Sequence, residues 1–460
     1  MSRFKLGGKK NKDMTQGNIW ILLLKFAAPL ALGYVFQQLY NTVDTYVVGN
    51  FVGTNAYAAV GNVGPIINML IGLFMGLATG AGVVLSQFYG AGDHDKVGKV
   101  VHTLMALTLV MGVIVSLTGI ALVEPMLDFM KILDPEVHAE AKVYLVTYFA
   151  GCIGLMVYNA GAGVLRAIGD STRPFVFLVI TALLNTALDL LFVIVFDLGV
   201  MGVALATVIA QLISAILVVI TLMRANGPYQ LHWSKVGFNL PTLRQVIKVG
   251  MPSALQQAVT AFSNVFVQAY INAFGSALMA GWTTYSKLDS FALIPMMSIG
   301  MASTTFVGQN LGAGNLERSK KGVRISLGLS LVSTAILLLP LMIWTKPLAT
   351  VFNPDPNVVE YAVLIIRVLS PFYLCCCVNQ IYAGALRGAG ASMVAMGIML
   401  SSFVVFRQIY LAIVSSLTDS VIWTIFSYPL GWILASTLGF LYYKFGHWEK
   451  YKLTNAKMKN

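Results

Sequence analysis

Three aspartates lie inside long apolar stretches of this sequence, a setting in which a charged side chain is costly. They are Asp44, Asp189 and Asp289. A carboxylate at the centre of a lipid bilayer costs roughly 2.5–3.5 kcal/mol on insertion scales, and such groups usually face a bundle interior or a water-filled cavity. Each aspartate therefore predicts a buried partner, a bound ion or a proton site.

Asp44 ends a polar stripe on its predicted helix. Gln37, Asn41 and Asp44 stand at i, i+4 and i+7, and Tyr40 lies one turn before the aspartate. This spacing places the side chains on one helical face, which we expect to look inward. We assign Gln37, Tyr40 and Asn41 to the surroundings of a site or to a substrate cavity.

A second polar pair lies on the fifth predicted helix. Asn185 and Asp189 are four residues apart and share a face, and Thr207 offers a hydroxyl on the sixth. At 1.5 Å per residue from the outer turns, Asp44 lies about 9 Å deep and Asp189 and Thr207 about 12 Å deep. We predict that Asp44, Asn185, Asp189 and Thr207 meet in one site in the outer half of the membrane.

Such a site could hold a hard cation or a proton. Carboxylate and carbonyl oxygens suit Na⁺, while burial and mutual repulsion favour a protonated acid, so the two carboxyls should titrate as a coupled pair. The alternative is a structural polar cluster that ties the three helices together. The sequence indicates no cofactor, and no metal beyond a coupling Na⁺.

The composition describes a chain whose main solvent is lipid. Of 460 residues, 57% are apolar and only 10% are charged, where soluble domains carry about 25% charge, and the mean hydropathy is +0.78. The four cysteines lie in apolar runs without a CxxC spacing, and the five histidines have no catalytic motif around them. Soluble enzymes and secreted disulfide scaffolds are excluded, and we expect no catalytic residues and no enzyme.

Long uncharged runs predict an all-α membrane protein with twelve spanning helices, because about 20 helical residues cross the hydrocarbon core. The predicted spans are residues 18–47, 55–86, 100–123, 143–165, 174–196, 199–223, 246–272, 276–308, 322–345, 358–386, 392–416 and 420–443.

The basic residues predict the orientation of these spans. With both ends inside, 23 of the 30 Lys and Arg fall in inner segments and only Lys131, Lys142 and Lys346 fall outside. Cytoplasmic loops carry such an excess of positive charge. The net charge of +12 therefore reports topology rather than binding to nucleic acid, and both termini should be cytoplasmic.

The chain is duplicated. Gln87 with the Gly-Ala-Gly turn at 90–92 recurs as Gln309 with 312–314, and the Leu165-Arg166 pair recurs as Leu386-Arg387. An even number of helices in each copy makes the repeats parallel, so we expect two six-helix bundles around a central cavity. The predicted domains are a cytoplasmic tail (1–17), an N-terminal bundle (18–223), a cytoplasmic linker (224–245), a C-terminal bundle (246–444) and a second tail (445–460).

The second copy lacks the acidic pair. At the repeat offsets, Asp44 maps to Phe266 and Asp189 to Tyr410, and the seventh helix carries a neutral stripe instead. Amide and hydroxyl groups can bond a substrate in a cavity but do not titrate near neutral pH. We therefore place ion coupling in the N-terminal half and assign Gln257, Thr260 and Asn264 to a substrate cavity.

Charged residues within the helices of the C-terminal half predict structural ion pairs. They are Lys287, Asp289, Arg367 and Arg407, with Asp289 pairing with Arg407 or Arg367. If the basic groups line the cavity instead, anionic lipid-linked substrates become the better candidates.

Several stretches of the sequence together resemble the bacterial multidrug and toxic compound extrusion (MATE) family, in the DinF-like branch of the multidrug/oligosaccharidyl-lipid/polysaccharide superfamily. The resemblance covers nearly the whole chain. It rests on residues 29–53, the SQFYGAG and GQNLGAG turns, the LRAIGDSTRP run with its copy LRGAGAS, and YSKLDSFALIP.

The resemblance implies an antiporter in a bacterial cell (inner) membrane that exchanges Na⁺ or H⁺ for amphipathic, cationic drugs or metabolites by alternating access. In that branch, the residues of the ion site match Asp44, Asn185, Asp189 and Thr207 of this sequence. Asn159 on the fourth helix matches another polar residue of the same bundle, and we assign it to the surroundings of the site or to the substrate cavity. Another branch places an acid on the seventh helix where this chain has Thr260. The alternative is a flippase for anionic lipid-linked oligosaccharide or peptidoglycan precursors. The expected partners are the bilayer and a small-molecule substrate, with the protein a monomer.

Overall fold

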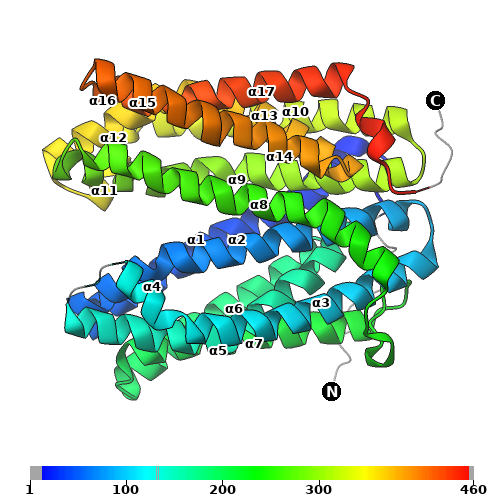
Figure 1. Ribbon diagram of the computed structural model, residues 1–460, viewed down its shortest axis with the longest axis horizontal. Helices are drawn as coiled ribbons and strands as arrows, with labels where there is room; N and C mark the ends of the chain where they lie inside the picture. Colours follow the sequence, from blue (N-terminus) through cyan, green and yellow to red (C-terminus); the bar gives the residue numbers. More distant parts are fainter. Residues whose placement is uncertain (1–12, 131, 133, 455–460) are drawn as a thin grey trace. The chain divides into compact units, whose positions relative to one another are not determined.

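The computed structural model describes residues 13–130, 132 and 134–454, and the regular elements in these ranges are helices (Figure 1). The predicted cytoplasmic segment 1–12, Lys131 and residues 455–460 lie outside the described residues. Helix starts follow capping chemistry: the Asp134 side chain accepts from the backbone N–H of Glu136 at 2.9 Å, and Pro135 opens the helix, where its missing N–H costs nothing.

The first half of the chain forms the helices that carry the acidic pair. Two of them, α1 and α6, run directly into short π-helical turns. The elements are α1 (Ile19–Val47), η1 (Val48–Val52), α2 (Thr54–Gly90), α3 (His94–Ala121), α4 (Val123–Phe129), α5 (Pro135–Ala167), α6 (Thr172–Leu190), η2 (Leu191–Val195), α7 (Gly199–Met223) and η3 (Trp233–Lys235).

The second half repeats the pattern with more interruptions. Its elements are α8 (Leu240–Asn272), α9 (Ser276–Gly312), α10 (Leu316–Ile343), α11 (Thr345–Phe352), α12 (Pro356–Leu369), η4 (Ser370–Phe372), α13 (Tyr373–Ala389), α14 (Ser392–Leu400), η5 (Ser401–Phe406), α15 (Arg407–Leu417), α16 (Val421–Ile425), α17 (Ser427–Phe445) and η6 (Trp448–Tyr451).

Eleven stretches of the described chain are helical, long and apolar enough to cross a membrane. Each matches one of the predicted spans, which confirms the all-α membrane fold. The twelfth, residues 246–272, is also helical, within α8, but is not among the eleven. We attribute this to its polar stripe.

The chain divides into two compact units, and the boundaries fall inside helices. One unit comprises Leu32–Lys248, and the other comprises Met14–Ala31 with Val249–Asn460. This differs from the predicted N-terminal bundle, which began at residue 18, and from a separate linker at 224–245. The start of α1 belongs to the second unit because Leu23 and Phe26 are buried in one apolar core with Phe306 of α9. Below, unit 1 means 32–248 and unit 2 means 14–31 with 249–454.

Unit 1 is tied together by close contact between α5 and α7. Gly151 and Gly161 of α5 lie against Val208 and Val218 of α7, with no room for a Cβ. Small residues at such crossings let two backbones approach. This packing supports the helices on which the acidic pair stands.

Candidate ion-binding site

Asp44 of α1 and Asp189 of α6 face each other inside unit 1. Their carboxyl groups lie within hydrogen-bonding reach of one another. Asp189 is completely buried, and neither of its oxygens accepts a hydrogen bond from a donor within the described chain. Two carboxyls in contact, one half-buried and the other fully buried without a donor, need a proton or a cation between them, because like charges at this distance repel.

Asn185 and Thr207 complete the cluster. In the amide orientation that satisfies both of its polar atoms, Asn185 donates to Asp44 Oδ1 at 2.9 Å, and its oxygen accepts from the backbone N–H of Thr207 at 3.3 Å. Thr207 of α7 thus takes part through its backbone, whereas the sequence pointed to its hydroxyl. The structure brings together all four residues predicted for this site.

Tyr144 of α5 also belongs to this cluster, although no pattern in the sequence predicts it. It interacts electrostatically with Asp44, Asp189 and Tyr40. Nothing in its spacing marks it among the aromatic residues of the apolar runs, so only the fold reveals it. Of the predicted surroundings, Tyr40 is half-buried and bonds to Gln37, while Gln37 and Asn41 are exposed.

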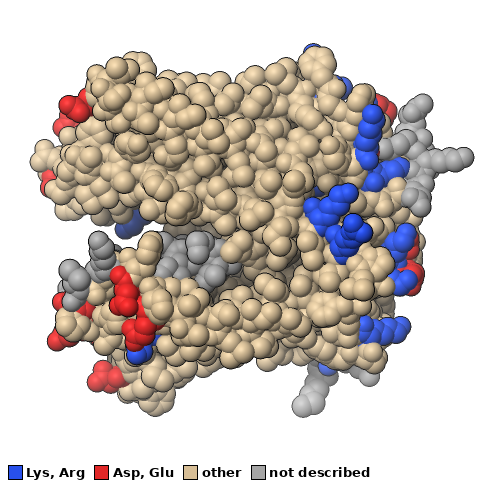
Figure 2. All heavy atoms as spheres, viewed as in Figure 1, with Lys and Arg blue, Asp and Glu red and all other residues tan. Residues whose placement is uncertain are grey.

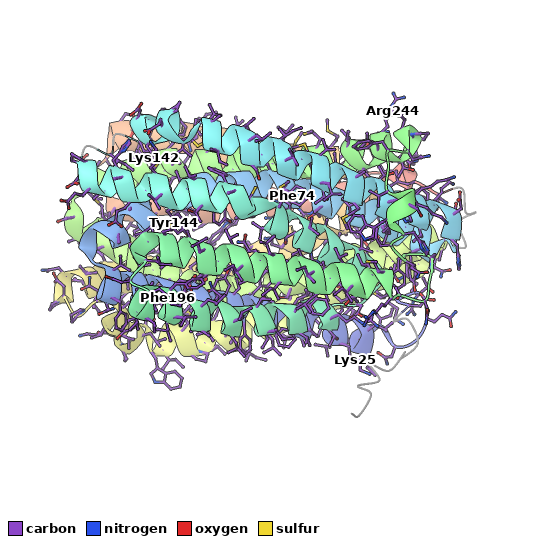
Figure 3. The ribbon with its side chains drawn as sticks, turned by 90° about the horizontal axis from the view of Figure 1, so that it is seen from below. Lys25, Phe74, Lys142, Tyr144, Phe196 and Arg244 are labelled. Atoms are coloured by element: carbon purple, nitrogen blue, oxygen red, sulfur yellow. The ribbon has the colours of Figure 1, made fainter. Side chains whose placement is uncertain are left out.

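The site lies in the half of unit 1 that contains Lys142. Figure 3 places Tyr144 near Lys142 and far from Arg244, which lies at the opposite end of this unit. The sequence assigned Lys142 to the outside and Arg244 to the inside, so this placement agrees with the depth estimated for the carboxyls.

A cluster of buried apolar side chains closes the unit just beyond the acidic pair. Both carboxyl-bearing helices continue into π-helical turns, η1 and η2, which are frequent at functional sites. The two turns meet in this cluster, which excludes water from that end of the site. Its members are Val47, Val48, Ala56, Val193, Val200 and Val203, with Tyr144 packed against them.

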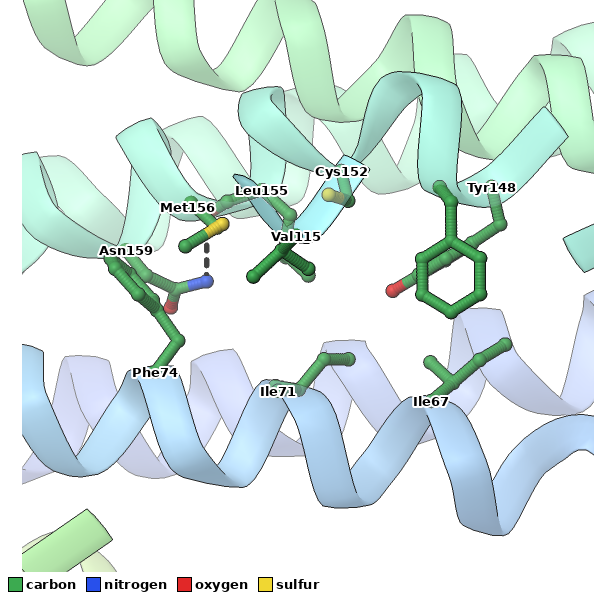
Figure 4. A pocket seen from close by; sticks show the side chains of 10 residues that line it. Ile67, Ile71, Phe74, Val115, Tyr148, Cys152, Leu155, Met156 and Asn159 are labelled. Atoms are coloured by element: carbon green, nitrogen blue, oxygen red, sulfur yellow. Dashed lines mark hydrogen bonds between the residues drawn. The ribbon is translucent and has the colours of Figure 1, made fainter. Parts of the chain in front are cut away.

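Asn159 lines a small pocket instead of joining the acidic pair. Its amide donates to the carbonyl of Leu155 at 2.9 Å, and Figure 4 shows it at the opposite end of the pocket from Tyr148. The enclosed space is about 30 Å³, room for a water molecule and not for a drug. Its walls are mainly apolar side chains of α2, α3 and α5.

In unit 2, the neutral stripe of α8 faces a buried arginine. Arg407 of α15 is 3% exposed and donates to Asn264 Oδ1 at 2.7 Å and to Ser263 Oγ at 3.1 Å. Gln257 is exposed, and the hydroxyl of Thr260 is buried with no hydrogen-bond partner among the described residues.

The predicted pairing of Asp289 with Arg407 is wrong. The Asp289 carboxyl accepts a hydrogen bond from Tyr373, while the Arg407 guanidinium lies 4.9 Å from the centre of the Tyr428 ring. Tyr428 interacts electrostatically with both charged groups, which do not form a salt bridge with each other. Asp289 and Arg407 thus contact aromatic and amide side chains, whereas the sequence predicted that they would form an ion pair.

The two other predicted ion-pair members have no acid within salt-bridge distance in the described part of the chain. Lys287 extends over the Phe352 ring, 5.6 Å from its centre, and Arg367 is exposed on α12. Their charges are therefore solvated or held by an aromatic face, not neutralised by carboxylates.

Comparison with known proteins gives a family match over both halves. The family model MatE matches residues 29–191 and again residues 252–413. The double match agrees with the internal duplication, and each copy covers most of the helices of one half.

Curated relatives and solved structures of similar length are found. The chain is 29% identical to the probable multidrug resistance protein YpnP of Bacillus subtilis, over 97% of this chain and 100% of that one. It is 25% identical to the FAD transporter of Shewanella oneidensis, over 92% and 94%. An outward-facing multidrug resistance MATE family transporter of the MOP superfamily superposes with a TM-score of 0.89 at 21% identity, over 97% and 100%.

Proposed function

The chain belongs to the MatE family, and we propose that it is a secondary active efflux transporter that exchanges Na⁺ or H⁺ for an amphipathic small molecule. The observation that carries this proposal is the contact between Asp44 and the fully buried Asp189, neither of which forms a salt bridge within the described part of the chain. Curated relatives named as multidrug resistance proteins support efflux as the direction of transport.

Coupling follows from the chemistry of the carboxyl pair. With neither proton nor Na⁺ bound, the two negative charges, of which that of Asp189 is fully buried, repel each other. A bound ion removes that repulsion and draws α1 and α6 together, so the ion has different affinities for different arrangements of these helices. Such differential affinity is what allows an ion to drive a conformational change. The substrate would then bind to the arrangement of α1 and α6 that forms once the ion has dissociated.

The test is efflux of a cationic dye from proteoliposomes under separately imposed Na⁺ and pH gradients. We expect Asp44→Asn and Asp189→Asn each to abolish ion-driven efflux, since an amide neither titrates nor balances a cation. Asp197→Asn is the matched control, because Asp197 is an exposed loop residue with a positive φ of 52°, which asparagine tolerates. Full ion-driven efflux by Asp44→Asn would overturn the site, and dye movement that ignores both gradients would overturn antiport.

A second candidate is transport of anionic substrates, including lipid-linked sugars. It is favoured by Arg407, a buried cation with no acid within salt-bridge distance in the described chain and an unpartnered Nε. The name of the FAD transporter is compatible with it, because FAD is a dianionic diphosphate. In the same proteoliposomes, anion-dependent competition for dye efflux that Arg407→Gln removes would favour this candidate.

A further inference from the structure

A basic recess lies at the surface of unit 2, whereas the carboxyl pair belongs to unit 1. It is bounded by the start of α1 (Gly17–Trp20) and the first turns of α10, and its open space amounts to about 920 Å³. Figure 2 shows basic side chains of this unit gathered mainly at one end. No role in the proposed transport cycle accounts for this recess.

The charge of the recess comes from one face of α10. Glu317, Lys320, Lys321 and Arg324 follow a spacing of three and four residues and so line one side of the helix. The single acid is already occupied, because Lys320 Nζ lies 3.0 Å from Glu317 Oε1. Lys321 and Arg324 remain exposed, with no acid within salt-bridge distance in the described residues.

Arg318 builds the wall of the recess. Its guanidinium donates to the carbonyls of Gly17 at 2.9 Å and Met14 at 3.3 Å. Asn18 caps α1 by accepting from the backbone N–H of Trp20 at 3.0 Å. The segment that precedes α1 is therefore held against α10, and the basic face of α10 is opposed by a fixed wall.

The recess opens next to surface that is apolar and exposed. Trp20, Ile21 and Leu24 on α1 are each about half exposed, at 48%, 50% and 49%. Both α1 and α10 begin membrane spans at this level. A tryptophan at the end of a span is typical of the headgroup region of a bilayer, and basic pockets at that level are suited to lipid phosphates.

We propose that this recess binds the phosphate headgroup of an anionic phospholipid, with Lys321 and Arg324 contacting the phosphate. The acyl chains lie along the exposed apolar face of α1 at Ile21 and Leu24. Trp20 packs beside the glycerol region, where its amphipathic ring is favoured. A lipid fits better than a soluble anion, because the charged groups and the lipid-facing surface are continuous.

The experiment is native mass spectrometry of the full-length protein titrated with phosphatidylglycerol, cardiolipin or phosphatidylcholine. We expect the first two to bind more tightly than phosphatidylcholine. The double variant Lys321→Gln/Arg324→Gln should lower affinity for the anionic lipids by about twenty-five-fold, since each basic group near such a headgroup contributes roughly fivefold. The control is Arg224→Gln/Lys235→Gln, which removes the same charge from exposed positions of unit 1 and should bind as wild type.

Three outcomes would overturn the proposal. One is equal binding of anionic and zwitterionic lipid. Another is undiminished phosphatidylglycerol binding by the double variant. The third is displacement of the lipid by inorganic phosphate at millimolar concentration, which would assign the recess to a soluble anion. Thermal melting of each variant in detergent without added lipid checks folding, and adding phosphatidylglycerol should then raise the Tm of wild type and control but not of the double variant.

Discussion

At the scale of single residues, the ion-binding proposal depends on how unequally the two carboxyls are bonded. Asp44 accepts from the Asn185 amide, while neither oxygen of Asp189 accepts from a donor of the described chain. The amide fixes the Asp44 carboxyl and directs it toward Asp189. In the proposed site, an ion between the two carboxyls would meet one ligand that is held in place and one that can adjust.

Replacing Asn185 with alanine should weaken ion coupling without abolishing it. A hydrogen bond to a charged group is worth about 1.5–3 kcal/mol, so the ion concentration for half-maximal dye efflux should rise by at least about tenfold. Asn50→Ala is the control, because Asn50 is exposed and its amide donates to the Tyr46 carbonyl four residues earlier in the chain. An unchanged half-saturating concentration in Asn185→Ala would mean that the amide does not support the site.

Residue patterns identified this site in part. Asp44, Asn185 and Asp189 were predictable because polar groups at spacings of four and seven are rare in apolar helices, and depth can be counted along a helix. Tyr144 was not, because an aromatic residue in an apolar run carries no such signal. The partners of Asp289 and Arg407 were also missed, since charge suggests an opposite charge while the fold supplies Tyr373 and Asn264.

At the scale of elements, the contact between α5 and α7 should be among the least tolerant of added volume. A Cβ at Gly161 would lie 2.7 Å from Val218 Cγ2, well inside van der Waals contact. Gly161→Ala should therefore lower the free energy of unfolding by about 1–3 kcal/mol, as overpacking usually does. Thermal melting in detergent measures the effect.

The matched control is Gly328→Ala on α10, where a Cβ meets nothing within 4 Å. Adding Val218→Ala to Gly161→Ala should restore much of the lost stability, because the two sites share one contact and are not additive. If the double variant is no more stable than Gly161→Ala, the loss of stability does not arise from the contact with Val218.

Helix positions were predictable from the length of the apolar runs, but the division of the chain was not. The sequence repeat begins each half with a helix, which suggested a boundary between helices. The structure divides α1 after Ala31 and α8 after Lys248, because the first turns of α1 bury Leu23 and Phe26 in the core of unit 2. Hydrophobic periodicity tells which face of a helix is buried, not which partner buries it.

At the scale of the whole molecule, duplication has produced two halves with unequal chemistry. Unit 1 carries the acidic pair, while unit 2 carries a buried arginine bonded to amide and hydroxyl groups. In an ion-coupled transporter, the ion at one site must shift a conformational equilibrium that also changes the affinity for the substrate. Under the proposed mechanism, the absence of acids at the equivalent positions of the second copy, Phe266 and Tyr410, assigns coupling to a single half.

The orientation of both halves can be tested by thiol labelling. With the four native cysteines replaced by serine or alanine, we expect Asp355→Cys to react with a membrane-impermeant maleimide in intact cells, because residue 355 precedes α12 at the end assigned to the outside. Lys235→Cys, in the exposed segment between α7 and α8, should react only in inverted vesicles, since the excess of Lys and Arg predicts that this end lies in the cytoplasm. Labelling in the opposite pattern would reverse the topology and place the carboxyl pair near the cytoplasmic surface. Ion access to the pair would then be from the cytoplasm, so the direction of exchange proposed above would fail with it.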